Sequence, residues 1–163
     1  VKIKKEDILD RLSFLESIIF EKNVKEILSH ILFEAQGEAV TLTVTNLETA
    51  LKCSIPAAVE KSGNISILAN KFSSIVRNLS KDSVISIVSG EGNKIELTST
   101  NKFKVDTQGF TKDDFPTIHE PEFSNSITIS QTLLKDLLRK RNPIWKVARL
   151  SISFNLSLNY LKR

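Results

Sequence analysis

The sequence predicts an α+β domain in which antiparallel strands pack against two helices. Several short segments alternate apolar and polar residues and are separated by turn residues at short intervals, as antiparallel strands require. Only two segments within residues 1–107 have apolar residues at helical spacing. The 163 residues are 40% hydrophobic and 26% charged, which is enough apolar material for one domain with a sizeable core.

The expected elements follow one another in the order helix, four strands, helix, three strands. Ile8, Leu12 and Leu15 recur at helical spacing and place the first helix over 6–17. Phe72 and Val76 do the same for a second helix over 70–79. The alternating segments predict strands over 1–3, 27–34, 40–46, 50–56, 65–68, 84–88, 94–99 and 102–107.

Two segments between and after these elements have their own character. Residues 89–93, Ser-Gly-Glu-Gly-Asn, are typical of a hairpin turn, since Gly and Asn tolerate positive φ. Gly109, Pro116 and Pro121 interrupt any regular element over 108–124, which we interpret as an interdomain linker that ends a first domain over 1–124.

A second domain is expected to begin at residue 125. Ile129, Leu134 and Leu138 repeat the spacing of Ile3, Ile8 and Leu12 with an offset of 126 residues, so a strand running into an amphipathic helix has begun again. The predicted helix over 131–140 cannot continue through Pro143. We therefore interpret 125–163 as the start of a duplicated domain with an atypical tail from residue 141.

The sequence lacks the residue patterns of common enzyme and metal sites. His30 and His119 are the only histidines, and neither belongs to a metal-binding spacing. The single Cys53 lies in an alternating segment without a nearby base, where a small buried apolar residue is the simplest interpretation. We expect a non-catalytic protein with no cofactor and no metal.

The compartment can be inferred from the same composition. The longest apolar runs, such as Ile18-Ile19-Phe20, fall far short of the roughly 20 residues that span a bilayer. The N-terminus does not resemble a signal peptide. One cysteine cannot form an internal disulfide, which favours a reducing cytosol. These observations predict a cytoplasmic protein without a membrane partner.

The net charge is less informative than it first looks. The formal charge of +4, with a pI near 9.2, suggests a polyanionic partner such as nucleic acid. Residues 141–163, however, contain five Lys and Arg and no acidic residue, which leaves 18 basic against 19 acidic residues in 1–140. DNA association must therefore depend on where individual side chains face.

Three short motifs follow one another along the chain: residues 42–48 (Leu-Thr-Val-Thr-Asn-Leu-Glu), residues 74–79, and Phe103 to Val105 followed by 114–116. Together they resemble motifs of the bacterial sliding clamps, the beta subunits of DNA polymerase III, and residues 42–48 are similar to the LTATDLE strand and turn of that family. Residues 74–79 resemble its DIVRALP helix, and Phe103 to Val105 followed by 114–116 resemble its FxL…DFP segment. The order and spacing agree, and the similarity runs from about residue 2 to residue 140.

The resemblance implies the DNA-clamp fold, with antiparallel sheets backed by two helices per domain, and a role in bacterial DNA replication. Such clamps have three similar domains per chain and close head to tail as homodimers around double-stranded DNA. They confer processivity on the polymerase and catalyse nothing, and their contacts to duplex phosphates are independent of sequence. Polymerase and clamp loader bind between later domains, which we expect this chain to lack.

The resemblance also assigns roles to individual residues. Lys22 takes the position of a basic DNA-contacting residue after the first helix, and Arg77 matches another on the second helix. Asn70 falls where many members have a basic DNA-contacting residue, and the adjacent Lys71 offers the charge that Asn70 lacks. The alternative for these positions is an ordinary solvated surface.

Phe103 and Val105 match the apolar pair that packs across the dimer interface of the family. Packing against the core from an alternating strand is the alternative interpretation, and it is compatible with a partner covering one face.

Two other classes of function remain open on the sequence alone. One is a small basic module that binds nucleic acid directly, with the tail as a cationic arm. The other is a structural interaction domain that has no affinity for DNA. A clamp slides off linear ends and stays on circles, whereas a direct binder holds both with a steep salt dependence.

Overall fold

The computed structural model describes residues 1–19, 25–100, 103–118, 130–133 and 136. The chain separates into two compact units, Val1–His119 and Glu120–Arg163. In the second unit, residues 131–133 and 136 are helical, and the Leu133 N–H donates to Ser130 Oγ at 3.2 Å, as at a helix N-terminus. These residues fall inside the helix predicted over 131–140. The assignment of a second domain from residue 125 stays a prediction.

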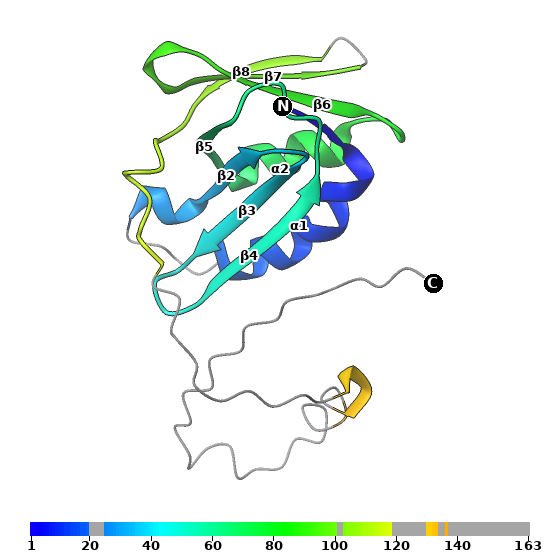
Figure 1. Ribbon diagram of the computed structural model, residues 1–163, viewed down its shortest axis with the longest axis vertical. Coiled ribbons are helices and arrows are strands. Elements are labelled where there is room, and N and C mark those ends of the chain that lie inside the picture. Colours follow the sequence, from blue (N-terminus) through cyan, green and yellow to red (C-terminus); the bar gives the residue numbers. More distant parts are fainter. Residues whose placement is uncertain (20–24, 101–102, 119–129, 134–135, 137–163) are drawn as a thin grey trace. The chain divides into compact units, whose positions relative to one another are not determined.

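Two antiparallel sheets form the framework of the first unit (Figure 1). The first sheet has the order β1-β6-β7-β8, which are Lys2–Lys4, Val84–Ser89, Lys94–Ser99 and Lys104–Gln108. The second sheet has the order β4-β3-β2-β5, which are Ala50–Pro56, Ala39–Thr45, His30–Gln36 and Gly63–Leu68. All the strand pairs within both sheets are antiparallel.

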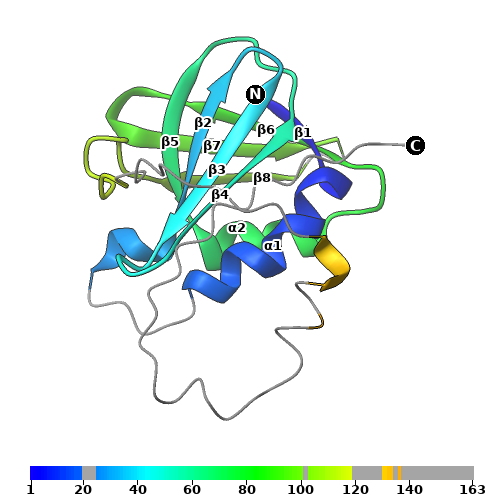
Figure 2. The ribbon, with the colours of Figure 1, turned by 60° about the horizontal axis from the view of Figure 1, so that its bottom comes forward.

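Two helices, α1 (Lys5–Ile19) and α2 (Ala69–Asn78), lie next to one another on the same side of the sheets (Figure 2). Glu6 and Asp7 in the first turn of α1 suit the partial positive charge of a helix N-terminus. At the same end of α1, Lys5 Nζ donates to the carbonyl oxygens of Arg77, at 3.3 Å, and Leu79, just after α2. This ammonium group satisfies carbonyls that the end of α2 leaves unpaired.

One hydrophobic core joins both helices to both sheets. Its fully buried members include Leu12 of α1, Phe72 of α2, Leu42 of the second sheet and Leu97 of the first. The Phe72 ring meets the Phe33 ring edge to face, with 5.0 Å between the centroids. The shared core explains why residues far apart in sequence fold as one unit.

The structure confirms the predicted α+β class and the order of elements, with one clear correction. The strand predicted over 27–34 begins only at His30, because Glu26–Ser29 form a 3-10 helix, η1. Leu28 is buried from within that helix, so its apolar character reflects packing rather than strand pairing. The other strand ends differ from prediction by at most two residues.

The hairpin turn predicted over 89–93 is also confirmed. It joins β6 to β7 through a short 3-10 turn, η2 (Glu91–Asn93), and Gly92 and Asn93 have φ of 67° and 59°. The Gly90 N–H closes the turn on the Lys94 carbonyl at 2.8 Å.

The first part of the segment predicted as a linker lies along β5. The Ser66 N–H donates to the Phe110 carbonyl at 3.0 Å, and the Phe110 N–H donates back to Ser66 Oγ at 3.1 Å. Farther along, Lys112 Nζ forms an ion pair with Glu34 at 2.6 Å. Phe115 is buried. Hydrogen bonds, an ion pair and a buried aromatic side chain therefore hold residues 109–115 against the first unit.

Gly109 allows this close approach. A Cβ at position 109 would collide with the Ser66 carbonyl oxygen and come within 2.6 Å of Ile95 Cδ1. Ser66 and Ile95 are both fully buried, so these neighbours have little room to yield.

We predict that Gly109→Ala lowers the free energy of unfolding by about 1–3 kcal/mol, the usual cost of overpacking. Gly63→Ala is the matched control, because nothing lies within 4 Å of a Cβ there; it is expected to be neutral or to stabilise by up to about 1 kcal/mol. Urea denaturation measures both. Equal effects of the two substitutions would contradict the role given to Gly109.

His30 of β2 is buried beside the same segment. Its ring meets the Phe110 ring edge to face at 5.0 Å, and its Nδ1 lies 3.1 Å from the Glu26 carbonyl oxygen. Burial lowers the pKa of His30 below its usual 6.5, although the hydrogen bond and the charge of Glu26 oppose this shift.

The lowered pKa of His30 predicts a loss of stability at mildly acidic pH. The unfolded chain binds the proton more readily, so the free energy of unfolding falls as pH drops below about 6.5, by at most about 1.4 kcal/mol per pH unit for one proton. His30→Phe should remove this component, as measured by urea denaturation between pH 5 and 8. An unchanged pH profile in that variant would show that other groups cause it.

Candidate functional site

The exposed face of α2 brings together three of the residues singled out in the sequence. Asn70, Lys71 and Arg77 are all solvent-exposed there, while Phe72 and Val76 point into the core. Lys71 Nζ lies 3.5 Å from the Asp106 carbonyl oxygen, a long and weak contact. No ion pair of Lys71 is found within the described part of the chain. Its charge is available to an anionic ligand.

Arg77 has a different environment. Its Nη2 donates to Glu16 Oε2 on α1, across 61 positions of sequence. The Glu16 side chain is only 9% exposed, whereas that of Arg77 is 52% exposed. The guanidinium thus partners a carboxylate that is largely withdrawn from water, and a buried carboxylate left without a partner is costly.

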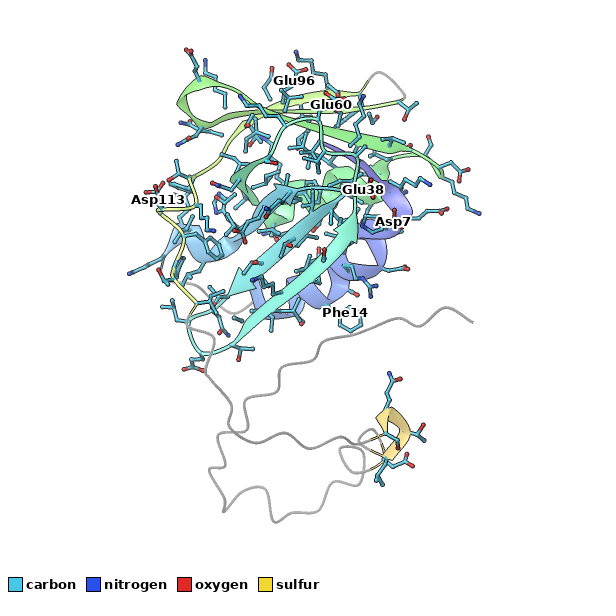
Figure 3. All side chains as sticks on the ribbon, in the orientation of Figure 1. Asp7, Phe14, Glu38, Glu60, Glu96 and Asp113 are labelled. Carbon is cyan, nitrogen blue, oxygen red and sulfur yellow. The ribbon has the colours of Figure 1, made fainter. Side chains whose placement is uncertain are left out.

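The fully exposed positions of α1, among its described residues, include no basic side chain. Glu6 and Asp10 are exposed together with the apolar Leu9 and Phe14. Phe14 is 60% exposed and projects away from the body of the domain (Figure 3). Lys22, predicted to contact DNA just after this helix, lies outside the described residues. Among the described residues of the two helices, the fully exposed basic side chains therefore lie on α2, while Lys5 and Arg11 of α1 are half-exposed.

The second candidate surface lies on β8. Phe103 immediately precedes this strand and is 38% exposed, whereas Val105 is partly buried against the core. Between them, Lys104 Nζ donates to Glu96 on β7 at 2.6 Å, which raises the pKa of Lys104. The two apolar residues are thus separated by a lysine that is fixed to the neighbouring strand.

Among the described residues, each sheet has one edge strand that is hydrogen-bonded to another segment and one edge strand that pairs with no further strand. β1, at one edge of the first sheet, exchanges backbone hydrogen bonds between Lys2 and Ala58, both at 2.9 Å. β5, at one edge of the second sheet, donates one backbone hydrogen bond from the Ser66 N–H to the Phe110 carbonyl, and Ser66 Oγ accepts one from the Phe110 N–H. β8 and β4 are the opposite edges, and no further strand pairs with either of them among the residues described. Each sheet therefore keeps one edge that can accept a partner strand.

Within the described ranges, no group of three His, Cys, Asp or Glu side chains could hold a metal ion. Burial raises the pKa of the Cys53 thiol, which fits the expected apolar role.

No helix among the described residues is long and apolar enough to cross a membrane. A depression of about 550 Å³ lies over β2, β3 and β5, with Glu34, Thr41 and Lys112 among its lining residues.

Two sheets with one open edge each, backed by a pair of helices, define a clamp domain. The family model of the DNA polymerase III beta subunit, N-terminal domain, matches residues 1–119. The chain belongs to this family.

Known proteins agree with this assignment. The beta sliding clamp of Pseudomonas aeruginosa is 28% identical over 138 residues, which cover 83% of this chain and 37% of that protein. The beta sliding clamp of Chlamydia muridarum is 24% identical over 127 residues, or 77% of this chain and 34% of that protein. The chain spans about a third of the length of these relatives.

Solved structures agree as well. The DNA polymerase III subunit beta from Pseudomonas aeruginosa matches with a TM-score of 0.77 and 25% identity over 85% of this chain and 37% of that one. A sliding clamp from Bartonella birtlesii, solved bound to griselimycin, matches with a TM-score of 0.79 and 26% identity over the same shares. These matches confirm the DNA-clamp fold predicted from the sequence.

Sequence reasoning missed one member of the candidate site. Glu16 looked like part of an ordinary amphipathic helix, and its only distinguishing mark was its position next to Leu15 on the apolar side. A charged residue on the buried side of a helix calls for a partner. That position could have been noticed, but the identity of the partner could not.

Proposed function

We propose that this chain is the first domain, with the beginning of a second, of a sliding clamp that encircles duplex DNA and confers processivity on the replicative polymerase. The single observation that carries the proposal is the pair of open edges at β4 and β8, one in each sheet. Domains with one open edge per sheet can join edge to edge, and a ring leaves no edge unpaired. The protein has no catalytic step in this role.

In this ring the helices face the duplex. The exposed face of α2 carries Asn70, Lys71 and Arg77, and we propose that Lys22 extends this surface. Contacts from its lysines reach phosphates rather than base edges, so they are independent of sequence and permit sliding. The neutral balance of charge over 1–140 favours weak contacts over tight binding.

In the full-length protein, Phe103 and Val105 pack across a head-to-tail homodimer interface at the open edge of β8. We further propose that the first domain extends over 1–124 and the second begins at 125. The polymerase and the clamp loader bind elsewhere in the full-length protein, and the complex works in the cytoplasm.

The difference in retention between circular and linear DNA tests the proposal that the protein encircles the duplex. After loading onto a nicked circular duplex, the full-length protein should stay bound for much longer than on the same DNA cut once, because a ring leaves only through an end. Gel filtration of the protein–DNA mixture before and after cleavage measures this difference. Equal retention on both forms, with a steep salt dependence, would instead identify a direct nucleic-acid binder.

The β8 edge offers a separate test. Phe103→Arg in the full-length protein should raise the dissociation constant of the dimer about thirtyfold, the effect of about 2 kcal/mol for a central apolar contact. Val88→Arg is the matched control, since Val88 is 52% exposed on β6 of the same sheet and away from β8. Sedimentation equilibrium measures both, and an unchanged dimer in Phe103→Arg would refute the interface.

A further inference from the structure

We propose that Glu16 withholds Arg77 from DNA, so that Lys71 alone supplies the phosphate contact of α2. The inference rests on the proposed function, since it concerns how the helical surface meets the duplex. It starts from the ion pair between Arg77 Nη2 and Glu16 Oε2, which joins an exposed cation to a buried anion.

The burial of Glu16 makes the pair persistent. Glu16 is 7% exposed and is the one carboxylate among the buried polar residues of the described chain. If Arg77 swung out to a phosphate, the carboxylate would remain in a poorly solvated place without its partner. The arrangement therefore favours Arg77 on Glu16 over Arg77 on DNA.

The backbone around Arg77 is fixed as well. Lys5 Nζ binds the carbonyl oxygens of Arg77 and Leu79, which ties the end of α2 to the start of α1. The guanidinium cannot approach DNA through a shift of the helix end without breaking these contacts. Its location relative to Glu16 is thus set by two independent links between the helices.

A phosphate that approaches this surface meets a pair without net charge. The attraction of the guanidinium is opposed by a carboxylate at hydrogen-bonding distance, so little counterion release is expected from the contact. Across α1 and α2 as a whole, four basic side chains are balanced by four acidic ones. Lys71, without an ion pair among the described residues, is the cation of α2 that remains.

Glu16→Gln in the full-length protein tests the inference. The amide keeps the size and an oxygen acceptor but releases the charge of Arg77. Fluorescence anisotropy with a short labelled duplex gives log Kobs against log salt, and the slope should steepen by about 0.9, the value for one added phosphate contact. Adding Arg77→Gln to this variant should cancel the gain.

Glu6→Gln is the matched control, because it removes the same charge from an exposed position of the same helix. It should change the slope far less, and Arg77→Gln should not reverse its effect. Equal effects of Glu6→Gln and Glu16→Gln would mean that general charge, and not the ion pair, governs binding. No gain in Glu16→Gln, including no binding at all, would also overturn the inference.

A second measurement uses the unaltered protein and does not depend on how well a variant folds. Phenylglyoxal modifies accessible guanidinium groups, and mass spectrometry follows the rate at Arg77 with and without duplex. The expected rate is the same in both, whereas protection of Arg77 by DNA would overturn the inference. Neither the salt slope nor the modification rate requires the protein to encircle DNA. The circular-DNA test can therefore fail while this inference holds, and this inference can fail while the circular-DNA test succeeds.

Discussion

The open edges of the two sheets constrain the rest of this structure. A sheet edge exposes unpaired backbone groups, and a small domain with two sheets has four such edges. The chain covers two of them itself, with Ala58 against β1 and Phe110 against β5. The contact of Phe110 with β5 is possible because Gly109 lets the backbone pass close to Ser66. The remaining edges at β4 and β8 belong to different sheets, so each sheet can accept one neighbouring strand.

Several charged side chains of the domain are likewise neutralised by a partner within it. Lys2 pairs with Glu60, Lys104 with Glu96, Lys112 with Glu34 and Arg77 with Glu16. Most of these pairs are exposed and stabilise the fold little. The Arg77 pair differs because its carboxylate is buried, so it links the two helices as well as cancelling a charge on their outer surface. A basic residue on an exposed helix is therefore not by itself evidence of a phosphate contact.

The sequence predicted the fold well where the information was local. Alternation gave the limits of β4 and β7 without error, and Gly92 with Asn93 identified the β6–β7 turn. It failed at 26–29, where apolar residues at strand-like positions form a 3-10 helix, because burial alone does not distinguish the two. It also failed to foresee that 109–115 would pack along β5. Contacts such as Glu16 with Arg77 or Phe110 with Ser66 join distant positions, and no local pattern encodes them.

A clamp has to hold itself together more firmly than it holds its DNA, and the two surfaces of this domain differ in that sense. An open edge with apolar side chains beside it gains both backbone hydrogen bonds and buried area when a partner strand arrives. Among the described residues, the helical surface that we propose faces a duplex carries Lys71 without an ion pair, Arg77 balanced by Glu16, and both acidic and half-exposed basic side chains on α1. Each additional phosphate contact would have to be broken and remade at every step of sliding. In the proposed ring, an Arg77 that stays paired with Glu16 would favour movement along DNA, while closure at β8 would prevent loss of the ring.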